Sequence, residues 1–226
     1  GSCDSHRALA TRIASAAKVD TVLPEYRLAP ENPFPAGLQD CVAAYRALLD
    51  QGYAADDIII GGDSAGGGLT MATMLQLRHD GIPLPRAAVL LSPFLDVSAS
   101  GESMKTRVER DPWFDPDNIS VVVGHYCPDE DPRNPLLSPV FANVAGLPST
   151  LIHVGDDEIL LSDSTRIADK LRAAGIEVEL EVFPEMWHVF QLFIGAMPES
   201  RVAVEKIGAY IRAAFGGAGP ETSAPS

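Results

Sequence analysis

Apolar residues recur along the chain in two alternating patterns. Short, nearly continuous apolar runs have the length of buried strands, whereas longer stretches carry apolar residues every three or four positions, which is typical of helices. The predicted strands cover 19–24, 57–62, 87–92, 149–154 and 176–183. The predicted helices cover 5–17, 36–51, 65–79, 163–174 and 199–215. Buried strands separated by helices predict an α/β fold, with a mostly parallel sheet and helices on both faces.

Three stretches break this alternation. Residues 25–36 carry closely spaced prolines, which exclude a helix or a central strand and predict a shaped loop. Residues 93–148 separate two strands by far more than an ordinary crossover, which predicts an inserted segment that contributes to a lid. The tail, 216–226, is of low complexity and is predicted to be disordered. We therefore expect one domain over residues 1–215.

Composition and charge exclude several classes of partner. The chain has 226 residues, of which 46% are hydrophobic, so it can bury a full core. Its net charge of −14 and its lack of a basic run argue against nucleic acid and against stable membrane association. No apolar run is long enough to span a membrane, and no signal-peptide pattern begins the sequence. Three cysteines without metal-ligand spacing predict neither a disulfide framework nor a metal site, and favour a cytoplasmic location.

The stretch GGDSAGGG, residues 61–68, lies where a predicted strand gives way to a predicted helix. Its pattern G-x-S-x-G around Ser64 is typical of a nucleophile elbow, in which flanking glycines permit a tight, strained turn. The helix that begins at Ala65 directs its N–H groups and its positive dipole end to the same place. A phosphate-binding loop or a plain tight turn is the alternative, although the lysine of a phosphate loop is missing.

A serine nucleophile needs a histidine base and an acid that orients it. His188 follows the last predicted strand and is the expected base, because this fold places the histidine after the acid in the chain. His153 is its rival, but it lies at the end of a strand where the acid is expected. Four carboxylates follow that strand within a few residues and leave the acid open: Asp156, Asp157, Glu158 and Asp163.

Four motifs occur in one order along the chain: YRLAPENPFPA at 26–36, GDSAGGG at 62–68, GDDEILLSD at 155–163 and FPEMWHVF at 183–190. In these motifs the sequence closely resembles the hormone-sensitive-lipase-type esterases, the bacterial family IV of the α/β-hydrolases. The resemblance implies an α/β-hydrolase fold and a serine carboxylic-ester hydrolase that acts on short to medium acyl esters. It implies no metal and no organic cofactor, because the triad chemistry requires neither. It also implies homodimers, with the last strand near the sheet edge.

The resemblance also assigns roles to individual residues. It places Glu158 at the acid position, with Asp157 as the alternative, because the family more often has aspartate there. It makes the Ala65 N–H one donor of the oxyanion hole. Trp113 and Phe114 are candidate walls of the substrate pocket, or else aromatic residues that pack within the lid. Tyr26, Arg27, Glu31 and Asp40 are expected to hold the proline-rich loop in place.

One departure from the family concerns the oxyanion hole. The HGGG motif that supplies its other donors is absent, and so is the strand that leads into that motif. Loss of one oxyanion donor typically lowers the rate about 10² to 10³-fold. We therefore expect a gap in the sheet beside strand 57–62 and interpret the sequence as an incomplete version of a longer chain. A non-catalytic ligand-binding relative and an amidase or peptidase on the same fold are the competing hypotheses.

Overall fold

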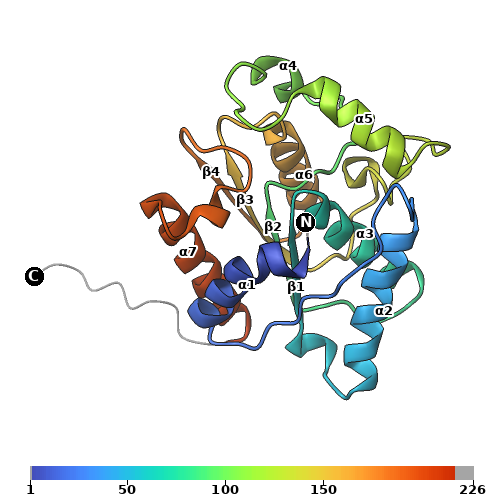
Figure 1. The fold of residues 1–226 in the computed structure, drawn as a ribbon. Coiled ribbons are helices and arrows are strands. Elements are labelled where there is room, and N and C mark those ends of the chain that lie inside the picture. The colour runs from blue at the N-terminus through green and yellow to red at the C-terminus, as the bar shows by residue number, and fades with distance from the viewer. Residues whose placement is uncertain (1, 217–226) are drawn as a thin grey trace, which may run out of the picture. The chain divides into compact units, whose positions relative to one another are not determined.

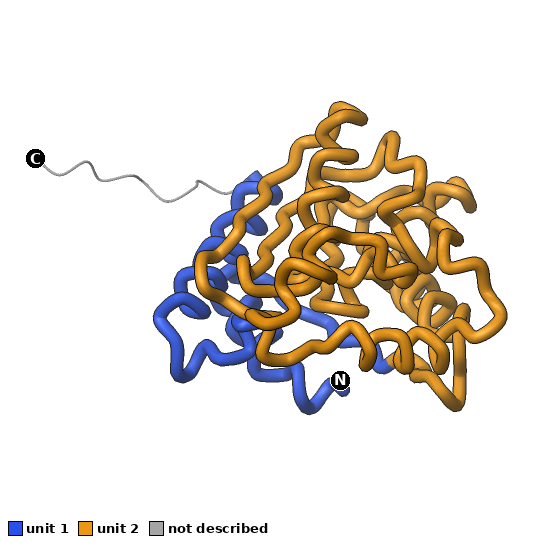
Figure 2. The backbone as a smooth tube through the Cα atoms, turned by 90° about the horizontal axis from the view of Figure 1, so that it is seen from above, with its two compact units in different colours: residues 1–25, 190–226 blue, residues 26–189 orange. Residues whose placement is uncertain are grey.

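The computed structural model describes residues 2–216 of the chain. These residues form two compact units, which Figure 2 distinguishes by colour. The larger unit contains Tyr26–Val189, and the smaller contains the described residues up to Glu25 and from Phe190 onward. Residues 217–226 of the predicted disordered tail lie outside the described residues.

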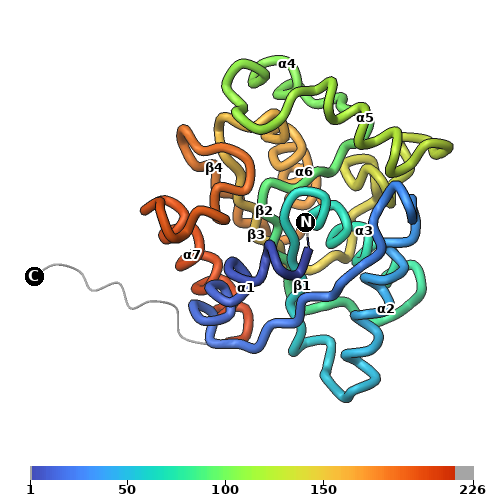
Figure 3. The backbone as a smooth tube through the Cα atoms, in the orientation of Figure 1, coloured from blue at the N-terminus to red at the C-terminus, as the bar shows by residue number. Residues whose placement is uncertain are grey.

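The larger unit is built on a parallel sheet. Its strands are β1 (Ile59–Asp63), β2 (Ala87–Leu91), β3 (Ser149–Gly155) and β4 (Val178–Phe183), in the spatial order β1-β2-β3-β4 (Figures 1 and 3). The parallel α/β architecture predicted from the sequence is confirmed. Strands β2 and β3 are buried on both faces, whereas β1 and β4 are partly exposed because they lie at the edges of the described sheet.

Three helices of this unit follow the predicted ranges closely: α2 (Ala36–Asp50), α3 (Ala65–His79) and α6 (Leu161–Ala173). Apolar side chains of α3 and α6 form one core with the central strands; its fully buried members include Met71, Met74, Leu90, Ile152, Ile167 and Leu171. On another side of α3, Leu38 and Val42 of α2 pack against Leu69. Helix α3 is therefore buried around most of its circumference, and the turn that precedes it is firmly held.

The smaller unit contains α1 (Cys3–Ala17), the short 3₁₀ helix η3 (Phe190–Phe193) and α7 (Pro198–Ala214), and α1 packs against α7. The prediction of a strand at 19–24 is wrong, because these residues form no strand in the structure. An extended segment becomes a strand only by pairing with a neighbour. Val22 and Leu23, which suggested a buried run, are exposed.

The inserted segment 93–148 carries structure of its own. It contains α4 (Ser103–Thr106), α5 (Pro116–Tyr126) and the short 3₁₀ helix η2 (Pro139–Phe141); a further 3₁₀ helix, η1 (Ala55–Asp57), precedes β1. Met104 and Ile119 of this segment pack against Ile159 and Leu160, which follow β3. The segment is thus joined to the carboxyl end of the sheet. No helix among residues 2–216 is both long and apolar enough to cross a membrane.

The proline-rich loop before α2 is held by one ion pair. The guanidinium of Arg27 donates to both carboxylate oxygens of Asp40, at 2.8 to 3.1 Å, and the Arg27 N–H donates to the same carboxylate at 2.8 Å. These bonds lower the pKa of Asp40 below its ordinary value. The Tyr26 ring packs on the α2 and α3 core, whereas Glu31 is exposed.

Asp163 ties the start of the inserted segment to α6. Its carboxylate is fully buried and accepts the Leu95 N–H at 2.7 Å. Burial raises the pKa of Asp163 to about 7, with a contribution from neighbouring Asp96. The Arg166 guanidinium donates to the Asp96 carboxylate at 2.7 Å. Its positive charge lowers the pKa of Asp163, but by less than burial raises it. The folded protein therefore holds a proton on Asp163 over a pH range in which the unfolded chain has released it.

We expect the unfolding free energy to fall as pH rises from about 4 to about 7, because in this range unfolding releases the proton that the folded protein holds on Asp163. The substitution Asp163→Asn, whose amide cannot ionise, should remove on the order of 2 to 4 kcal/mol of this fall. Urea unfolding at several pH values measures it. Asp169→Asn, at a carboxylate 81% exposed on the same helix, is the control and should keep the wild-type dependence. An unchanged pH dependence in Asp163→Asn contradicts the expectation.

Candidate active site

Ser64 lies in the sharp turn between β1 and α3. Its backbone angles, φ 53° and ψ −122°, are in a region that residues other than glycine rarely adopt. Two hydrogen bonds hold it there: the Ser64 N–H donates to the Leu91 carbonyl and its own carbonyl accepts the Phe94 N–H, both at 2.9 Å. The side chain does not cap α3, so the hydroxyl has no role in holding the helix end. The turn has the strained strand-to-helix geometry that the G-x-S-x-G pattern predicts.

The glycines of this turn have different roles. A side chain on Gly62 would collide with the backbone of Gly66, so the turn can close only with glycine at position 62. A side chain on Gly66 would meet no described atom within 4 Å, so crowding explains only one of the two flanking glycines. Ala65 is the first residue of α3, where a backbone N–H has no acceptor within the helix. That N–H is therefore available to bind an oxyanion.

Glu158 is a completely buried carboxylate with three donors around it. Oε1 accepts the Ser92 hydroxyl and the Gly155 N–H, each at 2.6 Å, and Oε2 lies 3.0 Å from His188 Nδ1. A buried carboxylate is stable only when such partners compensate for lost hydration. The structure therefore brings together Glu158 and His188, the acid and base implied by the family resemblance.

The neighbouring carboxylates have other partners. Asp157 is ion-paired with Arg110, and its N–H donates to the Met186 carbonyl at 3.1 Å. Asp156 lies 3.2 Å from the Arg107 guanidinium and 3.4 Å from that of Arg110. Among the four candidate acids, Glu158 is the one that faces His188.

His188 lies on the loop after β4 and is 3% exposed. Its Nδ1 is occupied by Glu158, which leaves Nε2 to exchange a proton with a nucleophile. Two residues before His188, the Met186 carbonyl lies against Gly155 at the end of β3. Glycine is required at position 155, because a side chain on it would collide with that carbonyl. His153, the rival base, instead packs against β4: its Nε2 is 3.8 Å from Glu181 and its ring centroid 5.0 Å from that of Phe183.

The two aromatic residues predicted as pocket walls have different surroundings. The Phe114 ring packs edge to face on the His188 imidazole, with centroids 4.6 Å apart and planes at 79°. Trp113 is 48% exposed. Phe114 therefore contacts His188 directly, whereas much of the Trp113 surface faces solvent.

Ser92 belongs to the site but carried no recognised motif in the sequence. It follows β2, is fully buried, and has a φ of 44°. Its hydroxyl donates to Glu158 Oε1 and accepts the Val189 N–H at 3.0 Å. It thus links Glu158 to the backbone next to His188. The sequence signal for Ser92 is its position one residue after a strand, which it shares with Ser64.

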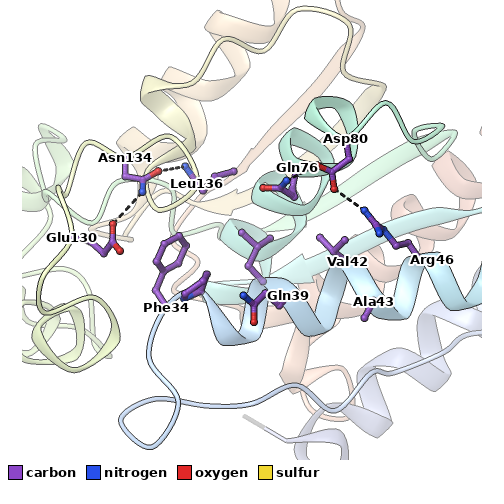
Figure 4. Close-up of a pocket in the computed structure, with 12 residues that line it drawn as sticks. Phe34, Gln39, Val42, Ala43, Arg46, Gln76, Asp80, Glu130, Asn134 and Leu136 are labelled. Carbon is purple, nitrogen blue, oxygen red and sulfur yellow. Dashed lines mark hydrogen bonds and ion pairs between the residues drawn. The ribbon is translucent and has the colours of Figure 1, made fainter.

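A groove of about 550 Å³ lies away from these residues, between α2, the end of α3 and residues 130–136 (Figure 4). Phe34, Leu38, Val42 and Leu136 give it an apolar lining, with the Arg46–Asp80 ion pair at its border. None of the predicted site residues lines it. Within residues 2–216, no three His, Cys, Asp or Glu side chains are grouped as metal ligands would be.

The role of Ser92 predicts a loss of stability. In Ser92→Ala, the buried Glu158 carboxylate loses one donor and the Val189 N–H loses its acceptor, which should lower the unfolding free energy by about 1 to 3 kcal/mol. Ser164→Ala is a matched control, because the Ser164 hydroxyl is equally buried but has no hydrogen-bond partner within the described residues. Urea unfolding should find Ser164→Ala unchanged or more stable. Equal losses in both variants argue against the Ser92 link.

Comparison with known proteins places this site in a family. The family described as alpha/beta hydrolase fold matches residues 1–192. An acetyl-hydrolase from Streptomyces hygroscopicus is 41% identical over 216 residues, covering 96% of this chain and 72% of that protein. An esterase from Acinetobacter venetianus is 36% identical over 211 residues, covering 93% of this chain and 70% of that protein.

Solved structures agree with these relatives. The crystal structure of an esterase from the bacterial hormone-sensitive lipase family matches with a TM-score of 0.94 at 43% identity, covering 95% of this chain and 72% of that one. An esterase/lipase from an uncultured bacterium matches with a TM-score of 0.93 at 42% identity, covering 96% of this chain and 73% of that one. The chain therefore belongs to the α/β-hydrolase family, among the esterases of the hormone-sensitive-lipase type.

Proposed function

We propose that this esterase-like enzyme hydrolyses carboxylic esters with short to medium acyl groups, through Ser64, His188 and Glu158. The observation that carries the proposal is the buried contact of 3.0 Å between Glu158 Oε2 and His188 Nδ1. It fixes the imidazole with Nε2 as the proton-accepting atom, which is the role of a base in this chemistry. The strained turn at Ser64 supports the other half of the proposal, because it follows a parallel strand of the same sheet.

In the proposed mechanism, the Ser64 oxygen attacks the ester carbonyl while His188 Nε2 takes the hydroxyl proton. Glu158 stabilises the imidazolium that forms, and the Ala65 N–H donates to the oxyanion. His188 then gives its proton to the departing alkoxide, which leaves Ser64 acylated. Water, activated by His188, attacks the acyl-enzyme and releases the acid.

The proposal extends to the domain and the partners. We propose that residues 1–215 act as one catalytic domain, with 93–148 contributing to a lid and with Phe114 near the substrate. Small-molecule esters are the proposed substrates. From the family resemblance we also propose homodimers, for which the exposed edge strand β4 is a candidate contact. Three free thiols, at Cys3, Cys41 and Cys127, support a reducing, cytoplasmic setting.

Ser64→Ala should lower the hydrolysis of p-nitrophenyl butyrate by at least about 10³-fold, because no other group supplies the nucleophile. Ser120→Ala, at an exposed serine of α5, is the control and should keep the wild-type rate. Initial rates on an ester, an amide and a peptide substrate separate the alternatives. Preference for the amide or the peptide favours the amidase or peptidase hypothesis. No turnover of any substrate by the wild type favours a non-catalytic relative, and unchanged turnover by Ser64→Ala rules out the triad.

Glu158→Gln should lower kcat by about 10² to 10⁴-fold with a small change in KM, because the neutral amide no longer stabilises the imidazolium. Asp157→Asn, which breaks only the ion pair with Arg110, should keep kcat within the same order of magnitude. Steady-state kinetics on p-nitrophenyl butyrate measures both. The reverse ranking of the two variants would assign the acid to Asp157.

A further inference from the structure

Asp111 lies in the inserted segment, in the turn between α4 and α5, and is 8% exposed. Its Oδ1 accepts two backbone N–H groups of its own segment, from Trp113 at 2.9 Å and from Phe114 at 3.1 Å. These two bonds form a local turn, which an aspartate commonly stabilises. By themselves they give Asp111 no role outside the segment.

The second oxygen of Asp111 makes a different kind of contact. Oδ2 accepts the N–H of Ile159 at 2.9 Å, from a residue 48 positions later in the chain. Ile159 directly follows Glu158, so this bond holds the backbone that carries the proposed acid. A carboxylate needed only for a local turn could stay in water, whereas burial is costly and requires that both oxygens be satisfied.

The local bonds of Asp111 also act on the other side of the acid–base pair. Phe114, whose N–H binds Oδ1, places its ring 4.6 Å from the His188 imidazole. The same carboxylate therefore holds the backbone beside Glu158 and the residue that packs on His188. Asp111 is therefore connected to both partners of the 3.0 Å contact, to Glu158 through the Ile159 backbone and to His188 through Phe114.

Two arginines join the same segment to the same loop. Arg107 donates to the Asp156 carbonyl at 2.7 Å, and Arg110 is ion-paired with Asp157. These pairs are 20% to 47% exposed and are screened by solvent. The bond between Asp111 and Ile159 is buried, so it sets the position of the acid loop more tightly than the ion pairs do.

We propose that Asp111 is a positioning residue for ester hydrolysis, which aligns Glu158 with His188 by binding the Ile159 and Phe114 backbones with one carboxylate. The inference rests on the proposed function of Glu158 and His188. Asp111 itself touches neither the substrate nor the reacting atoms. Through Phe114, it links the position of the inserted segment to the orientation of the His188 imidazole.

Asp111→Asn is the test, because the amide keeps one acceptor and turns a donor toward an N–H group. We expect kcat per active site to fall about 10- to 100-fold with a smaller change in KM, since a displacement of about 1 Å has an effect of this size. The concentration of active sites is measured by titration with an organophosphate that releases p-nitrophenol, so that unfolded protein is excluded from the calculated kcat. The acid limb of the pH–rate profile, which reports protonation of the base, should move to lower pH, because the imidazolium loses stabilisation.

Asp115→Asn is the matched control. Asp115 accepts the Asp117 N–H at 2.9 Å at the start of α5, so it stabilises a turn in the same segment but is exposed. It should keep the wild-type kcat and pH profile. Proton NMR adds a readout without substrate: the low-field signal of the His188 Nδ1 proton should weaken in Asp111→Asn and persist in Asp115→Asn. If Asp111→Asn fails to fold, Asp111→Glu, which displaces the carboxylate by one methylene, is measured in the same way.

The outcomes separate this inference from the proposed function. If Asp111→Asn matches Asp115→Asn in kcat, pH profile and NMR signal while Ser64→Ala and Glu158→Gln are inactive, the role of Asp111 is overturned and the triad stands. If turnover survives in Ser64→Ala, the proposed function fails whatever Asp111→Asn does. A loss of stability in Asp111→Asn with wild-type kcat per titrated site also overturns the inference, because it leaves only a structural role.

Discussion

The site depends on one buried negative charge. Glu158 is removed from water entirely, and a carboxylate in that position is stable only if donors replace its hydration. Its donors come from three separate parts of the chain: Ser92 after β2, Gly155 at the end of β3, and His188 after β4. The requirement to satisfy one carboxylate thus draws three strand ends together and orients the imidazole at the same time.

Backbone strain occurs in the segments that follow the strands. Ser64, Ser92 and Val189 all have positive φ, a conformation that costs free energy in residues with a side chain. Each is held by a bond to its surroundings: Ser64 to Leu91, Ser92 to the His153 carbonyl at 2.7 Å, and Val189 to the Ser92 hydroxyl. The buried sheet below supplies the stability that maintains these turns. Positive φ in the turns and loop that follow β1, β2 and β4 is typical of a site whose geometry matters more than its local stability.

Local sequence patterns predict the five long helices outside the inserted segment and the turn at Ser64, but they predict neither α4 nor α5, and they fail where a distant partner decides the structure. Helix periodicity located α3, and glycine spacing located the turn, because both are properties of short stretches. Residues 19–24 have the composition of a strand but no strand assignment, since pairing is not a local property. No local pattern predicts the roles of Ser92 and Asp111, because their partners, Glu158 and Ile159, are 66 and 48 positions away. The family resemblance favours Glu158 over Asp157 as the acid. The structure adds a physical difference between them, because Asp157 is ion-paired with Arg110 whereas Glu158 faces His188.

The inserted segment is constrained by the groups that it contacts. Long insertions at the carboxyl edge of a parallel sheet usually vary freely, because loops tolerate change better than the core does. Here Asp111 binds the backbone beside Glu158, and Phe114 packs on His188, so part of the segment is fixed to these two residues. Exposed residues such as Val121 and Val122 of α5 carry no such constraint. Change in substrate preference is therefore compatible with substitutions along α5, whereas a shift of residues 111–114 moves the groups that would perform the chemistry.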